Sequence, residues 1–246
     1  MKPDFEKSKL TVMGALVLLP IVVFSTLLTG CPAKSNPASP SSSATSVVYL
    51  YESDTTAAGN FQTLLDANGY SVTEVAMTDA GSLNFNSYGV IVISTDSASN
   101  SPWGTTAVVN AIKSSNKPVL GLGAGGAYFF DTAGDSSIGW NHAAGTAGIS
   151  VEAVTPSSSI WSSPNAISTS GAVTIYSTTS SGEEEQYTAP GSGTTLVAYN
   201  PSDTSYYPLA SYTSGGTTYF YWGFYSDPST MSTTGKNLFI NVMKSL

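Results

Sequence analysis

Cysteine and histidine, two side chains often used for nucleophilic and acid–base chemistry, are scarce in this chain. Cys31 is its only cysteine and His142 its only histidine among 246 residues. A disulfide within the chain is therefore impossible, and no thiol nucleophile exists after residue 31. Since one imidazole and scattered acids do not make a zinc site, we expect no metal and no cofactor.

Carboxylates and hydroxyls instead gather after two apolar runs, residues 47–51 and 88–93. The polar residues that follow these runs are Glu52, Ser53, Asp54, Ser94, Thr95 and Asp96. If both runs are parallel strands, their carboxyl ends meet at one sheet edge, and these side chains line a crevice there. Glu52 or Asp54 paired with Asp96 would suit a carboxylate-dependent hydrolase, provided that the carboxyl groups lie about 5–10 Å apart.

The elements that position these residues alternate between strand and helix. Apolar residues recur at helical spacing over residues 57–65, and residues 70–77 alternate as a second strand. Ser101 and Pro102 are predicted to open a helix that leads to a buried strand at residues 119–122. The pattern predicts an α/β fold with a doubly wound, mostly parallel sheet. After about residue 135, short β-like runs and glycine turns predict added hairpins, and residues 232–246 predict a closing helix.

A glycine-rich turn, KPVLGLGAGGAYFF, begins at Lys117. It resembles the strand and turn of the class I glutamine amidotransferase-like superfamily, which is flavodoxin-like in fold. Gly121 and Gly125 match the glycines of that motif, and Gly123 stands where the superfamily has its nucleophilic Cys. The resemblance implies a degenerate member without acyl-enzyme chemistry, because Gly123 has no side chain. His142 does not match the superfamily's catalytic histidine, which comes near the last strand.

Two other features of the sequence bear on activity. Residues 94–96 replace the glycine pair that helps to form the superfamily's oxyanion hole. The turn also contains the pattern G-x-G-x-x-G, formed by Gly121, Gly123 and Gly126. This pattern could instead be the fingerprint of a dinucleotide-binding site. That fingerprint belongs after the first strand and needs an acid about 20 residues later, and neither condition is met here.

The predicted crevice is acidic, rich in hydroxyls and partly aromatic. Its candidate ligand-binding residues are Glu52, Asp54, Ser94, Thr95, Asp96, Trp103, Gly123, Ala124, Gly125 and His142. Such a rim favours a neutral or cationic polar ligand over a phosphate. For His142 a hydrogen-bonded loop position is the alternative.

Two further clusters have a structural and a binding interpretation. Residues 183–185 are three consecutive glutamates, which predict either a solvated hairpin tip or a cation site. The aromatic run at residues 219–225 either packs in the core or stacks sugars.

The first thirty residues carry Lys2, Lys7 and Lys9 and then an uncharged apolar stretch. They predict a signal peptide over residues 1–30, and Leu28-Thr29-Gly30-Cys31 resembles the bacterial lipobox. This implies diacylglycerol and acyl chains on Cys31; a transmembrane anchor is the alternative. Residues 31–46 are a Ser/Pro-rich tether, and residues 47–246 are the α/β domain.

The net charge excludes one class of partner. The chain has no Arg, 8 Lys and 16 acids, a formal charge of −8 that would repel a nucleic-acid backbone. The lipobox, the glycine turn and the polar sheet edge together lead us to expect an extracytoplasmic protein that is anchored to a bacterial membrane by lipid. We expect it to bind a small polar ligand or an envelope partner without catalysis. A structural surface lipoprotein and a carboxylate-dependent envelope hydrolase are the alternatives.

Overall fold

The computed structural model describes residues 44–98, 102–134, 138, 142–144, 148–178, 184–187 and 192–246, the short segments 142–144 and 184–187 by backbone alone. The predicted signal peptide, the lipobox with Cys31 and nearly all of the tether lie outside these residues. Ser42–Leu246 form one unit. Its first strand begins at Thr45, two residues before the predicted start of the domain.

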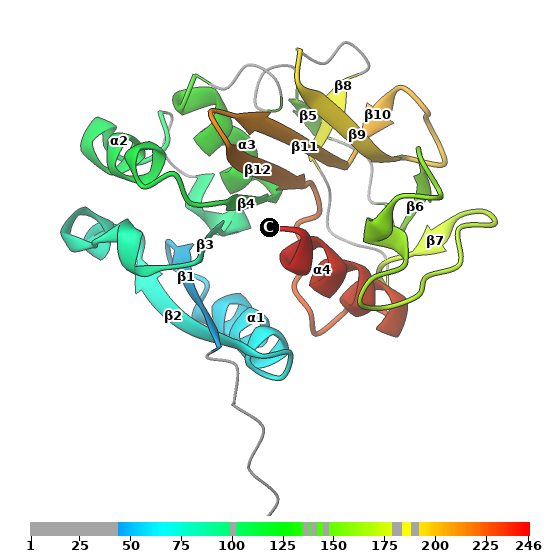
Figure 1. Cartoon of the computed structure of the whole chain (residues 1–246), viewed down its shortest axis with the longest axis horizontal. Helices are drawn as coiled ribbons and strands as arrows, with labels where there is room; N and C mark the ends of the chain where they lie inside the picture. The colour runs from blue at the N-terminus through cyan, green and yellow to red at the C-terminus, as the bar shows by residue number, and fades with distance from the viewer. Residues whose placement is uncertain are drawn as a thin grey trace, which may run out of the picture. The chain divides into compact units, whose positions relative to one another are not determined.

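Five parallel strands form the first part of the main sheet, in the order β2-β1-β3-β4-β12 (Figure 1). They are β1 (Thr45–Tyr51), β2 (Tyr70–Ala76), β3 (Val90–Ile93), β4 (Val119–Leu122) and β12 (Thr217–Trp222). This is a flavodoxin-like order, in which the direction of winding reverses between β1 and β3. Strands β3 and β4 are buried throughout, as continuous apolar runs between two helical layers must be.

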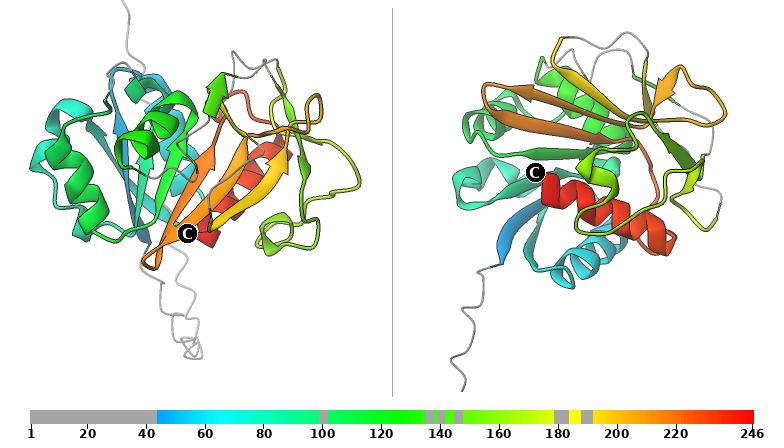
Figure 2. Two further views of the ribbon diagram at one scale, coloured as in Figure 1. Left: turned by 90° about the horizontal axis from the view of Figure 1, so that it is seen from above. Right: turned by 45° about the vertical axis from the view of Figure 1, so that its right-hand side comes forward.

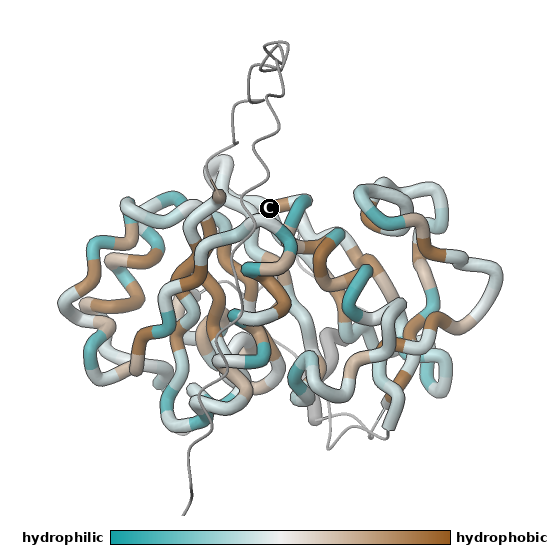
Figure 3. The backbone as a smooth tube through the Cα atoms, turned by 90° about the horizontal axis from the view of Figure 1, so that it is seen from below, coloured by the Kyte–Doolittle hydropathy of each residue, from teal (hydrophilic) through white to brown (hydrophobic). Residues whose placement is uncertain are grey.

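Helices cover both faces of this sheet. α1 (Thr55–Asp66) and α4 (Thr233–Ser245) share one apolar core with the first face, and α2 (Thr106–Ser114) and α3 (Gly123–Thr132) share another with the second. Figure 3 shows hydrophobic residues along the strands of the sheet and in the helices beside it. The doubly wound prediction is confirmed. α2, however, begins at Thr106 rather than near Pro102, because the Thr105 hydroxyl accepts a hydrogen bond from the N–H of Val108 and caps it there.

An antiparallel extension continues the sheet beyond β12 in the order β11-β9-β6-β7 (Figure 2). Its strands are β11 (Leu209–Ser214), β9 (Thr194–Tyr199), β6 (Ser150–Ala153) and β7 (Val173–Thr174). Gly215 and Gly216, with φ of 57° and 85°, form the predicted hairpin turn between β11 and β12.

A small second sheet has the order β10-β8-β5. Its strands are β10 (Tyr206–Tyr207), β8 (Glu184–Tyr187) and β5 (His142–Ala144). The sequence predicts one strand over residues 207–212, but Pro208 divides it into β10 and β11. Three helical turns of 3-10 type follow β2 and β3, namely η1 (Met77–Ser82), η2 (Phe85–Ser87) and η3 (Thr95–Ala98), and a fourth, η4 (Ser159–Trp161), precedes β7.

The aromatic run in β12 is structural. Tyr219 and Tyr221 pack in the core under α2 and α3, whereas Phe220 and Trp222 pack in the core under α1 and α4. All four are buried, and so is Phe224, so the core interpretation is confirmed for these five rings. Tyr225, the last residue of the predicted run, is instead half-buried. Among the described residues no helix is both long and apolar enough to cross a membrane.

Candidate functional site

The candidate site lies where the winding of the sheet reverses, between the loops that follow β1 and β3. The two strands are joined at this end by the N–H of Ser94, which donates to the carbonyl of Leu50 at 2.9 Å. Glu52 to Asp54 leave β1 toward α1, and Ser94 to Asp96 leave β3 into η3. Both loops emerge at the carboxyl edge, as the sequence predicts.

Asp96 connects these two loops. Its carboxylate accepts hydrogen bonds from three consecutive backbone N–H groups: Glu52 at 3.2 Å, Ser53 at 2.7 Å and Asp54 at 2.6 Å. The Ser94 hydroxyl donates to the same carboxylate. The backbone just before α1 therefore forms an anion-binding nest that Asp96 itself fills.

These contacts keep Asp96 ionised. Burial raises the pKa of the carboxyl group, but the hydrogen bonds from the Ser94 hydroxyl and from the N–H groups of Ser53, Asp54 and Glu52 outweigh burial and lower the pKa below 3.8. A carboxylate held in this way positions a loop. It is poorly suited to deliver a proton as a general acid near neutral pH.

The two other predicted carboxylates play different parts. Asp54 is the N-cap of α1, since its Oδ1 accepts from the N–H of Ala57 at 2.9 Å. Glu52 lies on the opposite side of the nest and lines a wide cleft, whereas Asp54 and Asp96 line a small pocket. The structure thus brings the three residues to one edge, as predicted, but divides their carboxylates between two cavities.

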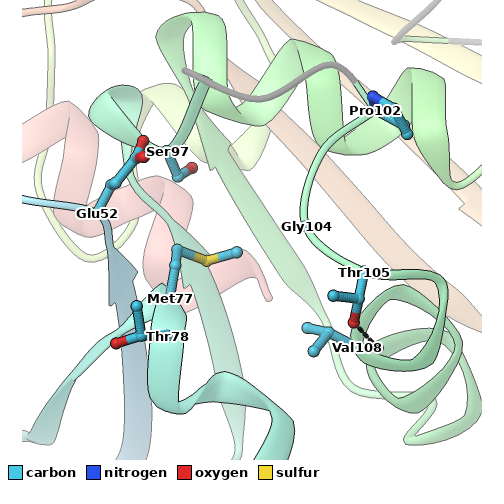
Figure 4. Close-up of a pocket in the computed structure, with 8 residues that line it drawn as sticks. All are labelled: Glu52, Met77, Thr78, Ser97, Pro102, Gly104, Thr105 and Val108. Atoms are coloured by element: carbon cyan, nitrogen blue, oxygen red, sulfur yellow. Dashed lines mark hydrogen bonds between the residues drawn. The ribbon is translucent and has the colours of Figure 1, made fainter.

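The wide cleft has a volume of about 480 Å³ and lies beside the face that α2 and α3 cover. Its lining residues are Glu52, Met77, Thr78, Ser97, Pro102, Gly104, Thr105 and Val108. Figure 4 shows the side chains of Glu52, Ser97, Met77 and Thr78 on one wall and the segment from Pro102 to Val108 on the other. Glu52 is the only charged residue in this lining, among three hydroxyls and several apolar groups.

The small pocket has a volume of about 90 Å³ and lies on the face that α1 covers. Its lining residues are Tyr49, Asp54, Ala57, Phe61, Ser94, Thr95, Asp96 and Tyr225. Burial and, after it, the carboxylates of Asp96, Asp54, Asp227 and Glu74 raise the pKa of Tyr49 well above 10.0. The Tyr49 phenol is therefore neutral, and the four carboxylates add negative potential at its position.

The turn from β4 into α3 places Gly123 beside this pocket. Gly123 has a φ of 44°, a conformation that side chains rarely adopt. A Cβ at this position would lie 2.6 Å from Tyr225 Cδ1 and 2.8 Å from Thr95 Oγ1. The space that a nucleophilic side chain would need is filled by two other residues.

The remaining glycines of the turn allow close packing. A Cβ at Gly125 would lie 1.9 Å from the carbonyl oxygen of Ser94, and a Cβ at Gly126 would lie 2.3 Å from the carbonyl carbon of Gly121. α3 therefore packs directly on the backbone of β4 and of the loop after β3. This accounts for the G-x-G-x-x-G pattern by packing, with no dinucleotide required.

Two predicted rim residues lie elsewhere. Trp103 is fully buried, and its indole N–H donates to Ser97 Oγ at 2.9 Å, so it belongs to the core and not to the rim. His142 lies in β5, paired with Gln186, and not in a loop. The local sequence, Ser101-Pro102-Trp103, does not indicate whether this Trp side chain is buried or lies on the rim. Ligand contact by Gly123, Ala124 and Gly125 stays a prediction.

Sequence reasoning missed several cavity residues: Tyr49, Phe61, Met77, Thr78, Thr105 and Val108. Met77 and Thr78 could have been found, since they follow β2 and the carboxyl-edge rule applies to every parallel strand. Residues 183–185 are only partly described: Glu184 and Glu185 lie in β8, a strand and not a hairpin tip, and Glu183 lies outside the described residues.

Comparison with solved structures finds proteins that share this fold. The chain is similar to a protein assigned as a GMP synthase subunit from Thermoplasma acidophilum, with 14% identity, a TM-score of 0.55 and coverage of 81% of this chain and 93% of that one. It is also similar to a ThuA-like protein from Bacteroides uniformis, with 13% identity, a TM-score of 0.51 and coverage of 87% and 94%. A chain of PurLQS from Thermotoga maritima has 11% identity, a TM-score of 0.50 and coverage of 82% and 99%. No protein-family model and no curated sequence matches.

These likenesses establish the fold. The described domain is a mixed α/β domain with a flavodoxin-like, mostly parallel sheet, which is the fold class that the sequence predicts. At such low identity the activities of these proteins do not pass to this chain.

Proposed function

We propose that this chain is a non-catalytic member of the glutamine amidotransferase-like superfamily that binds a small polar ligand or an envelope partner at the carboxyl edge of its sheet. The observation that carries the proposal is the filled position beside Gly123. The side chains of Tyr225 and Thr95 lie within 3 Å of the place where the Cβ of a cysteine would stand. The wide cleft at the same sheet edge, lined by Glu52, leaves about 480 Å³ for a ligand.

Lipid attachment is the second part of the proposal. The lipobox-like sequence Leu28-Thr29-Gly30-Cys31 after an uncharged apolar stretch supports acylation of Cys31 and a location outside the cytoplasm, on a bacterial membrane. Without residues 1–30 the chain has a charge of −9, so anionic headgroups would repel it. Acyl chains on Cys31, rather than a basic patch, would then hold the domain at the membrane.

The envelope-hydrolase alternative is weakened by the way in which its carboxylates are used. Asp96 is held by three N–H groups and a hydroxyl, and Asp54 caps α1. Glu52 lines a different cavity from both. The purely structural alternative expects a crevice filled by the protein's own side chains, whereas the wide cleft is open.

Catalysis is tested by incubating the full chain, purified in a nonionic detergent, with glutamine and with a simple ester. We expect no turnover, and none in Gly123→Cys either, because the new side chain would collide with Tyr225 and Thr95 at a strained φ. Turnover that Glu52→Gln or Asp96→Asn abolishes would overturn the proposal in favour of the hydrolase.

Attachment is tested by expressing the chain in bacteria with radiolabelled palmitate. We expect label in the membrane fraction, and loss of both label and processing in Cys31→Ser. If Cys31→Ser stays in the membrane and the parent chain takes up no label, the transmembrane anchor is correct instead.

A further inference from the structure

We propose that the small pocket beside Gly123 binds an alkylammonium group. This inference rests on the proposed function, since it assumes that the carboxyl edge binds a ligand instead of performing catalysis. It names the chemistry of the ligand, which the fold does not specify.

Charge is the first argument. The lining of the small pocket includes two carboxylates, Asp54 and Asp96, and none of its eight residues is basic. Asp227 and Glu74 lie close enough to add to the field at Tyr49. An anion would meet repulsion from every charged group in this lining, whereas a cation would meet attraction from each.

The two carboxylates contribute in different ways. Both oxygens of Asp96 already accept hydrogen bonds from Glu52, Ser53, Asp54 and Ser94, so Asp96 supplies negative potential. Asp54 uses Oδ1 to cap α1, and within the described residues its Oδ2 receives no hydrogen bond. Asp54 Oδ2 is thus the atom available to accept a hydrogen bond from an ammonium N–H.

Aromatic walls are the second argument. Tyr49, Phe61 and Tyr225 line the same cavity, and the rings of Tyr49 and Phe61 stack with centroids 5.4 Å apart. Aromatic rings beside carboxylates attract alkylammonium ions through cation–π and dispersion contacts, which a hydrated metal ion does not use as well. Tyr225 is half-buried and so forms the accessible wall.

Size is the third argument. A cavity of about 90 Å³ is far too small for a nucleotide or a sugar. It is well above the roughly 10–15 Å³ that one water molecule needs by this measure. The pocket therefore accommodates the charged end of a ligand, and the rest of that ligand extends outward from the sheet edge.

Binding is tested with the full chain in a nonionic detergent, by saturation-transfer NMR and calorimetric titration. The probes are n-butylammonium, 1-butanol, butyrate and tetrabutylammonium. We expect n-butylammonium alone to bind. Tetrabutylammonium has the same charge but cannot enter the pocket, so equal binding of both cations would show attraction to the acidic surface only and would overturn the proposal.

Variants locate the binding. Asp54→Asn removes the charge but keeps a good N-cap, so α1 should stay folded while n-butylammonium affinity falls at least about tenfold. Asp203→Asn is the matched control, because Asp203 Oδ1 also accepts a backbone N–H, that of Ser205, but lies in the loop between β9 and β10. Tyr225→Phe should bind nearly as well as the parent chain, and Tyr225→Leu several-fold more weakly.

Three further outcomes contradict the inference: no binding of n-butylammonium, equal losses in Asp54→Asn and Asp203→Asn, or preference for 1-butanol or butyrate. In the last case, loss of that binding in Tyr225→Leu would leave the proposed binding function standing and overturn only the ligand class. Glutamine hydrolysis would overturn the proposed function itself, whichever probe binds.

Discussion

The two halves of the main sheet differ in what surrounds them. In the parallel half, β2-β1-β3-β4-β12, helices cover both faces, and β3 and β4 are buried at every position. In the antiparallel extension, β11-β9-β6-β7, only part of each strand is buried, and Ile149 and Val154 beside β6 are exposed. Only the parallel half directs several loops to one edge where the winding reverses, and there both cavities of the candidate site occur.

The two halves therefore differ in their roles in the domain. The parallel half supplies a rigid sheet whose loops can hold side chains in place, as the Asp96 nest does. The extension enlarges the domain with Ser- and Thr-rich strands that contribute less to the core. Matched substitutions in the two halves test this division.

The largest difference is expected between two isoleucines. Ile91 in β3 is fully buried, whereas Ile149 is 38% exposed. Ile91→Ala should lower the free energy of unfolding by about 2–5 kcal/mol, since it leaves a cavity in the core. Ile149→Ala should cost less than about 1 kcal/mol. Urea titration of both variants, followed by tryptophan fluorescence, measures the contrast, and equal losses would refute it.

The next largest effect concerns glycines. Replacing a helical glycine by alanine normally favours the helix by about 1 kcal/mol. Gly125→Ala in α3 should nevertheless destabilise the domain by about 1–3 kcal/mol or more, because its Cβ would lie 1.9 Å from the Ser94 carbonyl oxygen. Gly171→Ala is the control, since no atom lies within 4 Å of its Cβ. Thermal unfolding that ranks Gly125→Ala as the more stable variant would mean that α3 does not pack so closely.

The smallest of the three effects is at Asp96. Asp96→Asn should cost about 1–3 kcal/mol at neutral pH, toward the lower end because the group is half-buried. Asp203 accepts only one hydrogen bond of this kind, from the N–H of Ser205, and an asparagine oxygen can still accept it, so Asp203→Asn should stay within about 0.5 kcal/mol of the parent chain.

The pH dependence follows from the direction of the Asp96 pKa. Because folding lowers this pKa below 3.8, the folded chain holds fewer protons than the unfolded chain near that pH. The stabilisation is therefore present above pH 3.8 and is lost as the pH falls through the folded pKa. Acid titration should show this loss in the parent chain and a smaller one in Asp96→Asn; identical curves would mean that Asp96 does not contribute.

Local sequence patterns were sufficient to predict most of the parallel half. Buried strands such as residues 90–93 and 119–122 are unbroken apolar runs, and caps such as Ser232 stand at the first turn of their helices. The predictions were wrong for strand β10 and for the start of α2. Each boundary is set by a single residue, Pro208 after β10 and the cap Thr105 before α2, and the general pattern of apolar and polar residues does not locate such a boundary.

The sequence by itself determined which residues reach the carboxyl edge, since a parallel strand sends its last residue to that edge whatever its neighbours are. It also determined that Gly123 has no reactive side chain. Only the tertiary structure decided that Tyr225 fills the space beside Gly123, that Asp96 occupies a nest of N–H groups, and that Trp103 is buried. Each of these depends on distances between segments far apart in the chain, and such distances are set by packing rather than by local pattern.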